Sequence, residues 1–371
     1  MKEKIAYVNY GFLDTDITVV KELQKVYDVV WFVLLGPTEP FKENFFYEFT
    51  NGTGVELRLT KYNCRRRSLE FARILFKTVE EIKRINPVLL YTCITDFYFV
   101  FSAILRIKHI PILLGIHDVV NHSNYNDSLL LKISIRISIM NAKHILLFSK
   151  NQYQLFQQLY PSKKASLVGM SYKDFGQPLV VHKKNDKIRL LFFGTLQFYK
   201  GTDLLIQAID ELISEGVTNL QLSIYGKPGN TDYKQKCLSY ITHKEFFNLH
   251  LEFVDNSDIP NIFASHDFSV FPYRDATQSG PLMINVCYGL PIIAPNHTCF
   301  SDIYNNEKDS LLYNNSHNVT DLKNSLKRLS QMNEKEINQM KSNALLLKES
   351  FSEERIGNNY IKVFSEVIER N

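Results

Sequence analysis

A lysine follows a glycine-terminated apolar run in the second half of the chain. Residues 190–193 are typical of a buried strand that ends at Gly194, and Lys200-Gly201 leads into a segment with helical spacing. In open parallel sheets ligands bind at the carboxyl ends of strands, and the first N–H groups of a helix favour anions. The spacing therefore predicts an anion-binding loop around Lys200, or else an ordinary strand-to-helix turn with a surface lysine.

A second loop has the same potential. Thr277-Gln278-Ser279-Gly280 follows an apolar run at 268–271 and precedes a proline, which is tolerated in the first turn of a helix. Its hydroxyls and backbone N–H groups can bind phosphate oxygens. One such loop is ordinary helix capping, but two of them after strands of one predicted sheet indicate a diphosphate site.

These loops need a parallel sheet to position them, and the chain predicts two such sheets. Short β-type runs alternate with helical ones throughout, which is typical of an α/β fold. Their nearly continuous apolar character indicates strands covered on both faces. The predicted strands are 5–10, 29–35, 55–59, 88–93, 112–116 and 144–148 in the first half, and 188–193, 220–225, 249–253, 268–271, 292–294 and 310–313 in the second.

Turn formers and charges at 176–186 predict a linker between two domains, which suits a length of 371 residues. The apolar stretch 88–105 approaches the length of a membrane span, but Asp96 near its middle would be costly in lipid. We therefore divide it into a strand at 88–93 and a helix at 96–108. Residues 129–140 show strand-like alternation of isoleucines, yet capping residues precede them, and we predict a helix there.

Composition excludes several classes of protein. Hydrophobic residues at 45% and charged residues at 22% exclude a disordered chain. Five scattered cysteines without a C-x-x-C pair argue against a disulfide framework or a zinc site, and no signal peptide is recognisable, so we expect a cytoplasmic protein.

Positive charge is concentrated in the first half. Residues 1–180 hold 23 Lys and Arg against 16 Asp and Glu, whereas the whole chain carries only +4. The densest basic cluster consists of Lys61, Arg65, Arg66, Arg67, Arg73, Lys77, Lys83 and Arg84. This asymmetry predicts either an anionic partner, such as a membrane surface or an acceptor, or simply a solvated basic face. No nucleic-acid-binding module surrounds the cluster, so nucleic acid is not expected as a partner.

The second half resembles the donor domain of family 4 glycosyltransferases of the GT-B fold. The resemblance is carried by Gly194…Lys200-Gly201, Tyr225-Gly226, Phe253-Val254, the segment 266–272, and Gln278-Ser279-Gly280 followed by Gly289-Leu290-Pro291. Residues 351–355 and the helix after them resemble the family's tail that returns to the N-terminal domain. Residues 110–118 resemble the acceptor-domain strand that ends in histidine.

The resemblance implies two Rossmann-like parallel-sheet domains that face a cleft. The acceptor-binding domain would be 1–178, completed by a helix at 352–371, and the donor-binding domain would be 188–351. The donor-binding residues that it implies are Gly11, Gly194, Thr195, Lys200, Tyr225, Gly226, Val254, Thr277, Gln278, Ser279 and Gly280.

Several positions depart from the family pattern. Thr195 stands where the family commonly has arginine, and Ala276 and Ile284 stand at the positions of its two glutamates. Neither Ala276 nor Ile284 can hydrogen-bond a sugar through its side chain. The usual Gly-Gly after the first strand is reduced to Gly11. The chain is similar to a subset of relatives with a Gln-Ser-Gly loop, and these changes weaken any assignment of the donor sugar.

On the acceptor side, the resemblance implies His117 as the residue nearest the reacting carbon, where its ring can hydrogen-bond a sugar hydroxyl or developing charge. Lys200 is the other expected catalytic residue. Asp118 either orients His117 or caps the next helix, and His122 is a second acceptor-side candidate. A strand-end histidine without this resemblance is more often structural.

Asp14-Thr15-Asp16 matches the D-x-D pattern of metal-dependent glycosyltransferases of the GT-A fold. It follows the first strand, which is too early in the chain for that fold. We interpret it as a loop and helix cap, and expect no essential metal.

The sequence therefore predicts a glycosyltransferase that moves a sugar from a nucleotide-diphosphate sugar to a glycan or lipid-linked acceptor. The resemblance implies retention of configuration and a role in bacterial surface polysaccharide biosynthesis, of the O-antigen or capsule type. It also allows peripheral contact with the inner face of the cell membrane. Two alternatives remain: a sugar-nucleotide epimerase of the same fold, and a non-catalytic sugar-nucleotide-binding partner.

Overall fold

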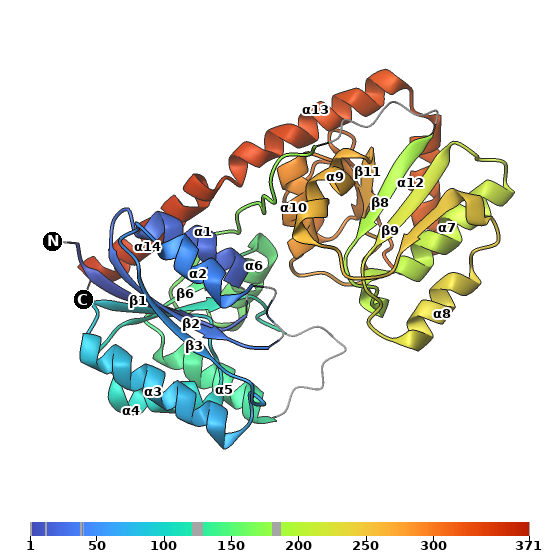
Figure 1. The fold of residues 1–371 in the computed structure, drawn as a ribbon. Coiled ribbons are helices and arrows are strands. Elements are labelled where there is room, and N and C mark those ends of the chain that lie inside the picture. Colours follow the sequence, from blue (N-terminus) through green and yellow to red (C-terminus); the bar gives the residue numbers. More distant parts are fainter. Residues whose placement is uncertain are drawn as a thin grey trace. The chain divides into compact units, whose positions relative to one another are not determined.

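The chain divides into two compact units, each built around a parallel sheet (Figure 1). The computed structural model describes residues 2–11, 13–37, 39, 41–120, 129–179 and 187–370. One unit comprises Met1–Ser171 with Glu353–Asn371, and the other comprises Tyr172–Ser352. Unit one thus ends shortly before the predicted linker at 176–186, of which 180–186 lie outside the described residues.

Within the described ranges, the first unit holds a seven-stranded sheet in the order β3-β2-β1-β4-β5-β6-β7, with all neighbouring strands parallel. The strands are β1 (Lys4–Asn9), β2 (Asp28–Leu35), β3 (Glu56–Lys61), β4 (Leu89–Thr92), β5 (Ile112–Ile116), β6 (His144–Leu147) and β7 (Ala165–Leu167). The helices are α1 (Leu13–Leu23), α2 (Glu43–Thr50), α3 (Leu69–Ile85), α4 (Phe97–Arg106), α5 (Leu129–Asn141), α6 (Lys150–Leu159) and α14 (Glu353–Glu369).

Helices cover both faces of this sheet, as the continuous apolar strands require. Helices α1 and α14 pack on one face, and α3 and α4 pack on the other. The C-terminal helix α14 approaches α1 so closely that a Cβ at Gly357 would lie 2.3 Å from the side chain of Glu22. Glycine at 357 therefore permits this helix to join the first unit.

The apolar stretch 88–105 consists of β4 and α4, and Asp96 separates them. Its carboxylate accepts a hydrogen bond from the N–H of Tyr98 and so caps α4. No helix among the described residues is long and apolar enough to cross a membrane. The helix predicted at 129–140 is confirmed by α5.

The second unit, as far as it is described, holds a six-stranded sheet in the order β10-β9-β8-β11-β12-β13, again with parallel neighbours. Its strands are β8 (Ile188–Phe193), β9 (Leu220–Tyr225), β10 (Phe247–His250), β11 (Phe268–Val270), β12 (Ile292–Pro295) and β13 (Ser310–Tyr313). Its helices are α7 (Thr202–Ser214), α8 (Thr231–Ser239), α9 (Ile259–Ala264), α10 (Gly280–Tyr288), α11 (Thr298–Ser301), α12 (Val319–Gln331) and α13 (Glu334–Ser350), with short 3₁₀ turns η1 (Phe198–Lys200), η2 (Lys244–Phe246) and η3 (Asn256–Asp258).

Two parallel α/β sheets are what the sequence predicted, and that prediction is confirmed. Most predicted strands agree with the structure to within one or two residues at each end, and the largest differences concern β10 and β7. β10 begins at Phe247 and not at residue 249, because Phe246 and Phe247 are the buried aromatics and Phe253 is 69% exposed. β7 was not predicted; it is a three-residue edge strand, too short for a recognisable pattern.

Candidate functional site

Lys200 ends the loop that joins β8 to α7, and its side chain is buried, with 7% exposed. Among the described residues, none forms an ion pair or hydrogen bond with its Nζ; the ring centres of Tyr199 and Tyr273 lie 5.9 and 5.7 Å from that atom. Burial lowers the pKa of Lys200 to about 8. A buried ammonium group without a carboxylate favours an anionic ligand, because the ligand would supply the missing counter-charge.

Gly194 and Gly226 bring the ends of β8 and β9 together beneath that ammonium group. The N–H of Gly194 donates to the carbonyl of Tyr225 at 2.9 Å, and a Cβ at Gly226 would lie 2.0 Å from the Gly194 oxygen. A Cβ at Gly194 would lie 2.8 Å from Nζ of Lys200 and 3.5 Å from Cγ of Pro281. The φ of Gly194 is +134°. Glycine at 194 thus leaves room for the lysine to lie over the strand end.

The second predicted loop meets the first at this edge, because Pro281 belongs to the first turn of α10. The N-cap of α10 is Ser279, whose hydroxyl accepts from the N–H of Leu282 at 3.3 Å. A Cβ at Gly280 would lie 3.5 Å from Nζ of Lys173, so a second cation lies at this helix start. The sequence around Lys173 contains no recognisable motif, and Lys173 was therefore not predicted as a site residue. Thr277 and Gln278 precede the cap in the same loop.

An ion pair that the sequence did not reveal fixes both loops. Nη1 and Nη2 of Arg274 donate to the two carboxylate oxygens of Asp203 at 2.8 and 2.9 Å. Nη1 also donates to the carbonyl of Phe198 at 2.6 Å, and the N–H of Arg274 donates to the carbonyl of Tyr199 at 2.7 Å. Arg274 therefore joins the loop that ends in Lys200 to the loop that leads to α10.

The carboxylate of Asp203 accepts hydrogen bonds from three side chains. Besides Arg274, it accepts from the hydroxyl of Tyr233 at 2.8 Å and from Nζ of Lys236 at 2.9 Å. Burial alone would raise the pKa of Asp203, but the hydrogen bonds outweigh it and lower the pKa to about 2. Asp203 is thus a permanent anion that is satisfied by its neighbours, whereas Lys200 has no carboxylate partner in the part of the chain that the structure describes.

A pocket of about 340 Å³ adjoins the ends of β9 and β10. Tyr225 and Val254, both predicted donor-binding residues, line it. The ring of His250 stacks on Tyr225 at a centroid distance of 4.2 Å and an angle of 7°. Since Gly226 follows Tyr225, this pocket begins next to the Gly194 edge. His250 was not predicted, because only the fold places it beside Tyr225.

The first unit holds the remaining predicted residues. Gly11 follows β1 with φ +69°, and a Cβ there would meet no atom within 4 Å. His117 and Asp118 follow β5, and the ring of His117 stacks on Phe148 at 4.3 Å. β1 and β5 are parallel and flank β4, so these residues lie at the carboxyl edge of the first sheet. His122 lies outside the described residues.

Asp14 and Asp16 belong to the first turn of α1 and not to a preceding loop, which corrects the prediction. The Oδ1 atom of Asp16 accepts from the hydroxyl of Tyr7 at 2.7 Å and from Nδ2 of Asn9 at 2.8 Å, so the side chain points into the unit and does not cap the helix. Burial raises the pKa of Asp16 to about 8. No group of three or more His, Cys, Asp or Glu that could hold a metal ion occurs in the described part of the chain.

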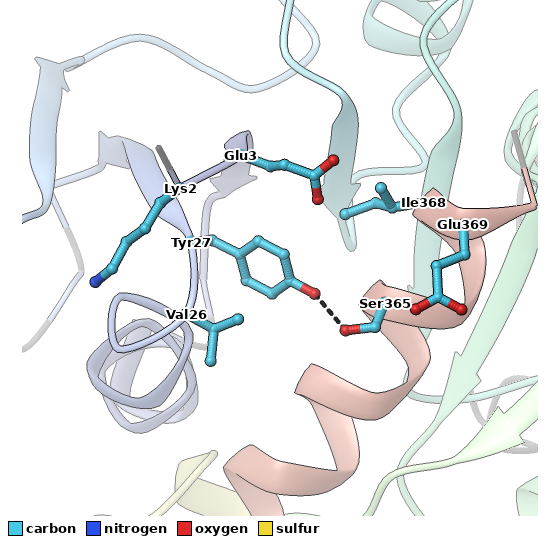
Figure 2. Close-up of a pocket in the computed structure, with 7 residues that line it drawn as sticks. All are labelled: Lys2, Glu3, Val26, Tyr27, Ser365, Ile368 and Glu369. Atoms are coloured by element: carbon cyan, nitrogen blue, oxygen red, sulfur yellow. Dashed lines mark hydrogen bonds between the residues drawn. The ribbon is translucent and has the colours of Figure 1, made fainter.

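Figure 2 shows another cavity, of about 740 Å³, in the first unit. It lies between Glu3, which precedes β1, Tyr27, which precedes β2, and the last turns of α14; the hydroxyls of Tyr27 and Ser365 lie 2.7 Å apart there. This is the amino edge of the sheet, opposite the edge where ligands bind in parallel α/β sheets. We therefore do not assign it to the active site.

The chain was compared with known families and proteins. Residues 187–332 match the family model described as "Glycosyl transferases group 1", which covers β8 to α12 and thus every donor-side loop described above. No curated protein sequence matches the chain significantly.

Solved structures share the fold over nearly the whole chain. An Anabaena protein, HepE, in complex with UDP and glucose has a TM-score of 0.73 at 12% identity and covers 98% of this chain and 100% of that one. Sucrose-phosphate synthase from Thermosynechococcus elongatus has a TM-score of 0.74 at 14% identity, with full coverage of both chains. The lipopolysaccharide outer core galactosyltransferase WaaB has a TM-score of 0.68 at 15% identity, covering 98% and 99%.

These neighbours have the GT-B architecture, so the two parallel sheets of this chain form a GT-B fold. The segment that carries Lys200, Gly194 and the Ser279 cap is also the segment that the family model matches. The chain is therefore a glycosyltransferase with the GT-B fold, and its residues 187–332 match the glycosyl transferases group 1 family.

Proposed function

We propose that the second unit binds the donor, a nucleotide-diphosphate sugar, with its diphosphate between Lys200 and the N-terminus of α10. The observation that carries this proposal is the buried ammonium group of Lys200, which lies over Gly194 and has no carboxylate partner among the described residues. The amide groups near Ser279 and Gly280 and the dipole of α10 add positive potential at the same edge.

The chemical task is to stabilise the diphosphate as it leaves the sugar. Each helix-dipole contact contributes only about 0.3–2 kcal/mol. A catalysed transfer needs a barrier lower by at least about 8 kcal/mol, so rigid positioning must contribute as well. The bidentate pair of Arg274 and Asp203 supplies that rigidity, because it fixes the loop on both sides of Lys200. We expect no essential metal.

The nucleoside would occupy the pocket lined by Tyr225 and Val254, with His250 stacked on Tyr225. Gly226 directly follows β9, and Thr195 follows Gly194 at the end of β8; in this proposal both contact the donor. Structures of HepE contain UDP or UDP-glucose, which supports a uridine nucleotide as the first donor to test.

The acceptor would bind the first unit at the carboxyl ends of β1 and β5, where Gly11, His117 and Asp118 lie. In this proposal Gly11 also contacts the donor, His117 hydrogen-bonds the transferred sugar, and the reaction retains configuration. The acceptor is a glycan or a lipid-linked oligosaccharide of bacterial surface polysaccharide biosynthesis. Fold similarity to a lipopolysaccharide galactosyltransferase supports this class. The protein would work in the cytoplasm, in peripheral contact with the inner face of the membrane.

A thermal-shift panel of UDP, GDP, ADP and CMP sugars tests the donor. The expected result is stabilisation by one nucleotide class, reduced in Lys200→Ala. Product analysis with that donor then tests the reaction. Transfer to an added glycan supports the proposal, whereas interconversion of the sugar without an acceptor shows an epimerase. Binding with neither transfer nor hydrolysis shows a non-catalytic binding partner.

A further inference from the structure

One face of the first unit leaves large apolar side chains exposed in a row. Phe97, Phe101 and Leu105 follow one another at four-residue spacing along α4 and are 45%, 49% and 61% exposed. The rings of Phe97 and Phe101 are nearly parallel, with centroids 6.0 Å apart. Four-residue spacing places all three on one side of the helix. A helix that only packs on its sheet would carry polar residues there.

The neighbouring helix α5 extends this apolar row. α5 packs beside α4, and Figure 1 shows α3, α4 and α5 on the same face of the sheet. Ile133 and Met140 of α5 are 41% and 70% exposed. We call the exposed side of these two helices the α4–α5 face, consisting of Phe97, Phe101, Leu105, Lys132, Ile133, Arg136 and Met140.

The charge on this face has one sign. Neither α4 nor α5 contains Asp or Glu, while α5 exposes Lys132 and Arg136. Within the described ranges, neither of these two side chains forms an ion pair or a hydrogen bond. α3, on the other side of α4, carries charges of both signs: Arg73 and Lys77 are exposed, and the carboxylate of Glu80 lies 3.6 Å from Nε of Arg106 in α4. An apolar row beside two cations that have no partner among the described residues is complementary to a surface that is apolar inside and anionic outside.

We propose that the α4–α5 face binds the anionic surface of a phospholipid bilayer, with Phe97, Phe101 and Leu105 inserted among the acyl chains and Lys132 and Arg136 at the headgroups. A second copy of the chain is the other obvious occupant. A two-fold contact on this face would, however, bring two surfaces together that both carry Lys132 and Arg136 and to which neither α4 nor α5 contributes a carboxylate. Anionic headgroups supply the charge that a second copy lacks.

The assignment places the membrane contact on α4 and α5 and not on the basic cluster around Arg66 that the sequence analysis described. The guanidinium group of Arg66 lies 4.7 Å from the ring centre of Tyr10, and its Nε donates to the hydroxyl of Tyr62 at 3.2 Å. A further nitrogen lies 3.8 Å from the carboxylate of Glu39. Arg66 is thus engaged within the unit, and the apolar residues that insertion requires lie on α4 and α5.

This inference rests on the proposed membrane-linked acceptor, and its test uses neither donor nor acceptor. Trp31 is the only tryptophan and is fully buried, so a Phe101→Trp variant adds one exposed reporter. With phosphatidylcholine vesicles that contain phosphatidylglycerol, we expect its emission to shift to the blue and to be quenched by brominated lipid. With phosphatidylcholine alone, or at high salt, the shift should be small. An unchanged emission with the anionic vesicles overturns the proposal.

Sedimentation with the same vesicles separates the contribution of the apolar side chains from that of the basic ones. We expect Phe97→Ser with Phe101→Ser, and separately Lys132→Ser with Arg136→Ser, to reduce vesicle binding at least tenfold. The matched control is Leu345→Ser with Leu346→Ser, two similarly exposed leucines of α13 in the other unit, which should bind like the wild type. Equal vesicle binding by all variants overturns the proposal. So does a wild-type protein that forms dimers, if the Phe97/Phe101 variant no longer forms them. Donor-induced thermal shifts, measured without vesicles, test the proposed function independently.

Discussion

The guanidinium group of Arg274 donates two hydrogen bonds, of 2.8 and 2.9 Å, to the carboxylate of Asp203, and it also donates to the carbonyl of Phe198. Phe198 precedes Lys200 by two residues and Asp203 follows it by three. One buried side chain from the second loop therefore fixes the backbone on both sides of the only lysine that lies over Gly194 in the described structure. The position of Lys200 thus depends on Arg274, which lies 74 residues further along the chain.

We expect Arg274→Lys to weaken both stability and donor use. Lysine keeps the charge but cannot make the parallel pair and the carbonyl contact together, which should cost about 1–3 kcal/mol. For a unit of this size that lowers the melting temperature by roughly 2–4 °C per kcal/mol. Donor KM should rise because Lys200 loses its support. Arg328→Lys is the matched control, since Arg328 pairs with Glu307 on the surface; if both variants behave alike, Arg274 does not position Lys200.

Lys200→Ala should lower kcat/KM for the donor while the fold is kept. Loss of a charge-assisted hydrogen bond costs about 1.5–3 kcal/mol, which corresponds to roughly ten- to more than a hundredfold. Steady-state kinetics with the donor found in the thermal-shift panel measures this loss. Lys335→Ala, on the exposed side of α13, serves as the control. Wild-type kcat/KM in Lys200→Ala would refute the assignment of the donor loop.

The pKa of Lys200 gives donor binding a distinctive pH dependence. Burial lowers that pKa to about 8 in the free protein, so the ammonium form is complete below this pH and is lost above it. A bound diphosphate stabilises the ammonium form and raises its pKa again. We therefore expect the donor Kd to be flat below pH 8 and to rise up to tenfold per pH unit above it. Isothermal titration across this range should show no such rise in Lys200→Ala.

Much of the fold was accessible from local patterns. The strands 112–116, 188–193, 220–225 and 310–313 were predicted with the bounds that the structure shows, because continuous apolar runs between turn formers are local signals. The loops at Gly194 and Ser279 were predicted for the same reason. The ion pair that joins these loops was not predicted, because Arg274 and Asp203 are 71 residues apart and no local spacing relates them.

The same limit explains the other differences. Asp16 was interpreted as a cap because capping is the usual role of an aspartate at a helix start, whereas Tyr7 and Asn9 of β1 turn its side chain inwards. Exposure on α4 was missed because Phe97 and Phe101 look like core residues. Only the packing of α3, α4 and α5 shows which side of the helix stays uncovered.

His117→Ala should reduce turnover far more than nucleotide binding. His117 belongs to the first unit, at the end of β5, whereas the proposed nucleotide pocket at Tyr225 belongs to the second. We expect the Kd of the free nucleotide diphosphate, measured by isothermal titration, to stay within twofold of the wild type while kcat falls at least tenfold. Phe148→Leu tests whether loss of the ring stacked on His117 has the same effect. Equal losses of turnover and nucleotide affinity would mean that His117 is structural.

Asp16 should make the first unit less stable as pH rises. Burial raises its pKa from 3.8 to about 8, so the folded state keeps a proton that the unfolded chain releases above pH 4. Folding stability therefore falls between about pH 4 and pH 8, by up to the order of 5 kcal/mol at 1.36 kcal/mol per pH unit.

Asp16→Asn removes the titration and keeps an oxygen for the hydrogen bonds from Tyr7 and Asn9. We expect the melting temperature of the variant to fall less than that of the wild type between pH 5 and pH 8, as followed by circular dichroism. Asp14→Asn, in the same turn of α1, is the control that should leave the wild-type slope unchanged. Parallel slopes for the wild type and Asp16→Asn would show that Asp16 is already ionised in the folded protein at pH 5.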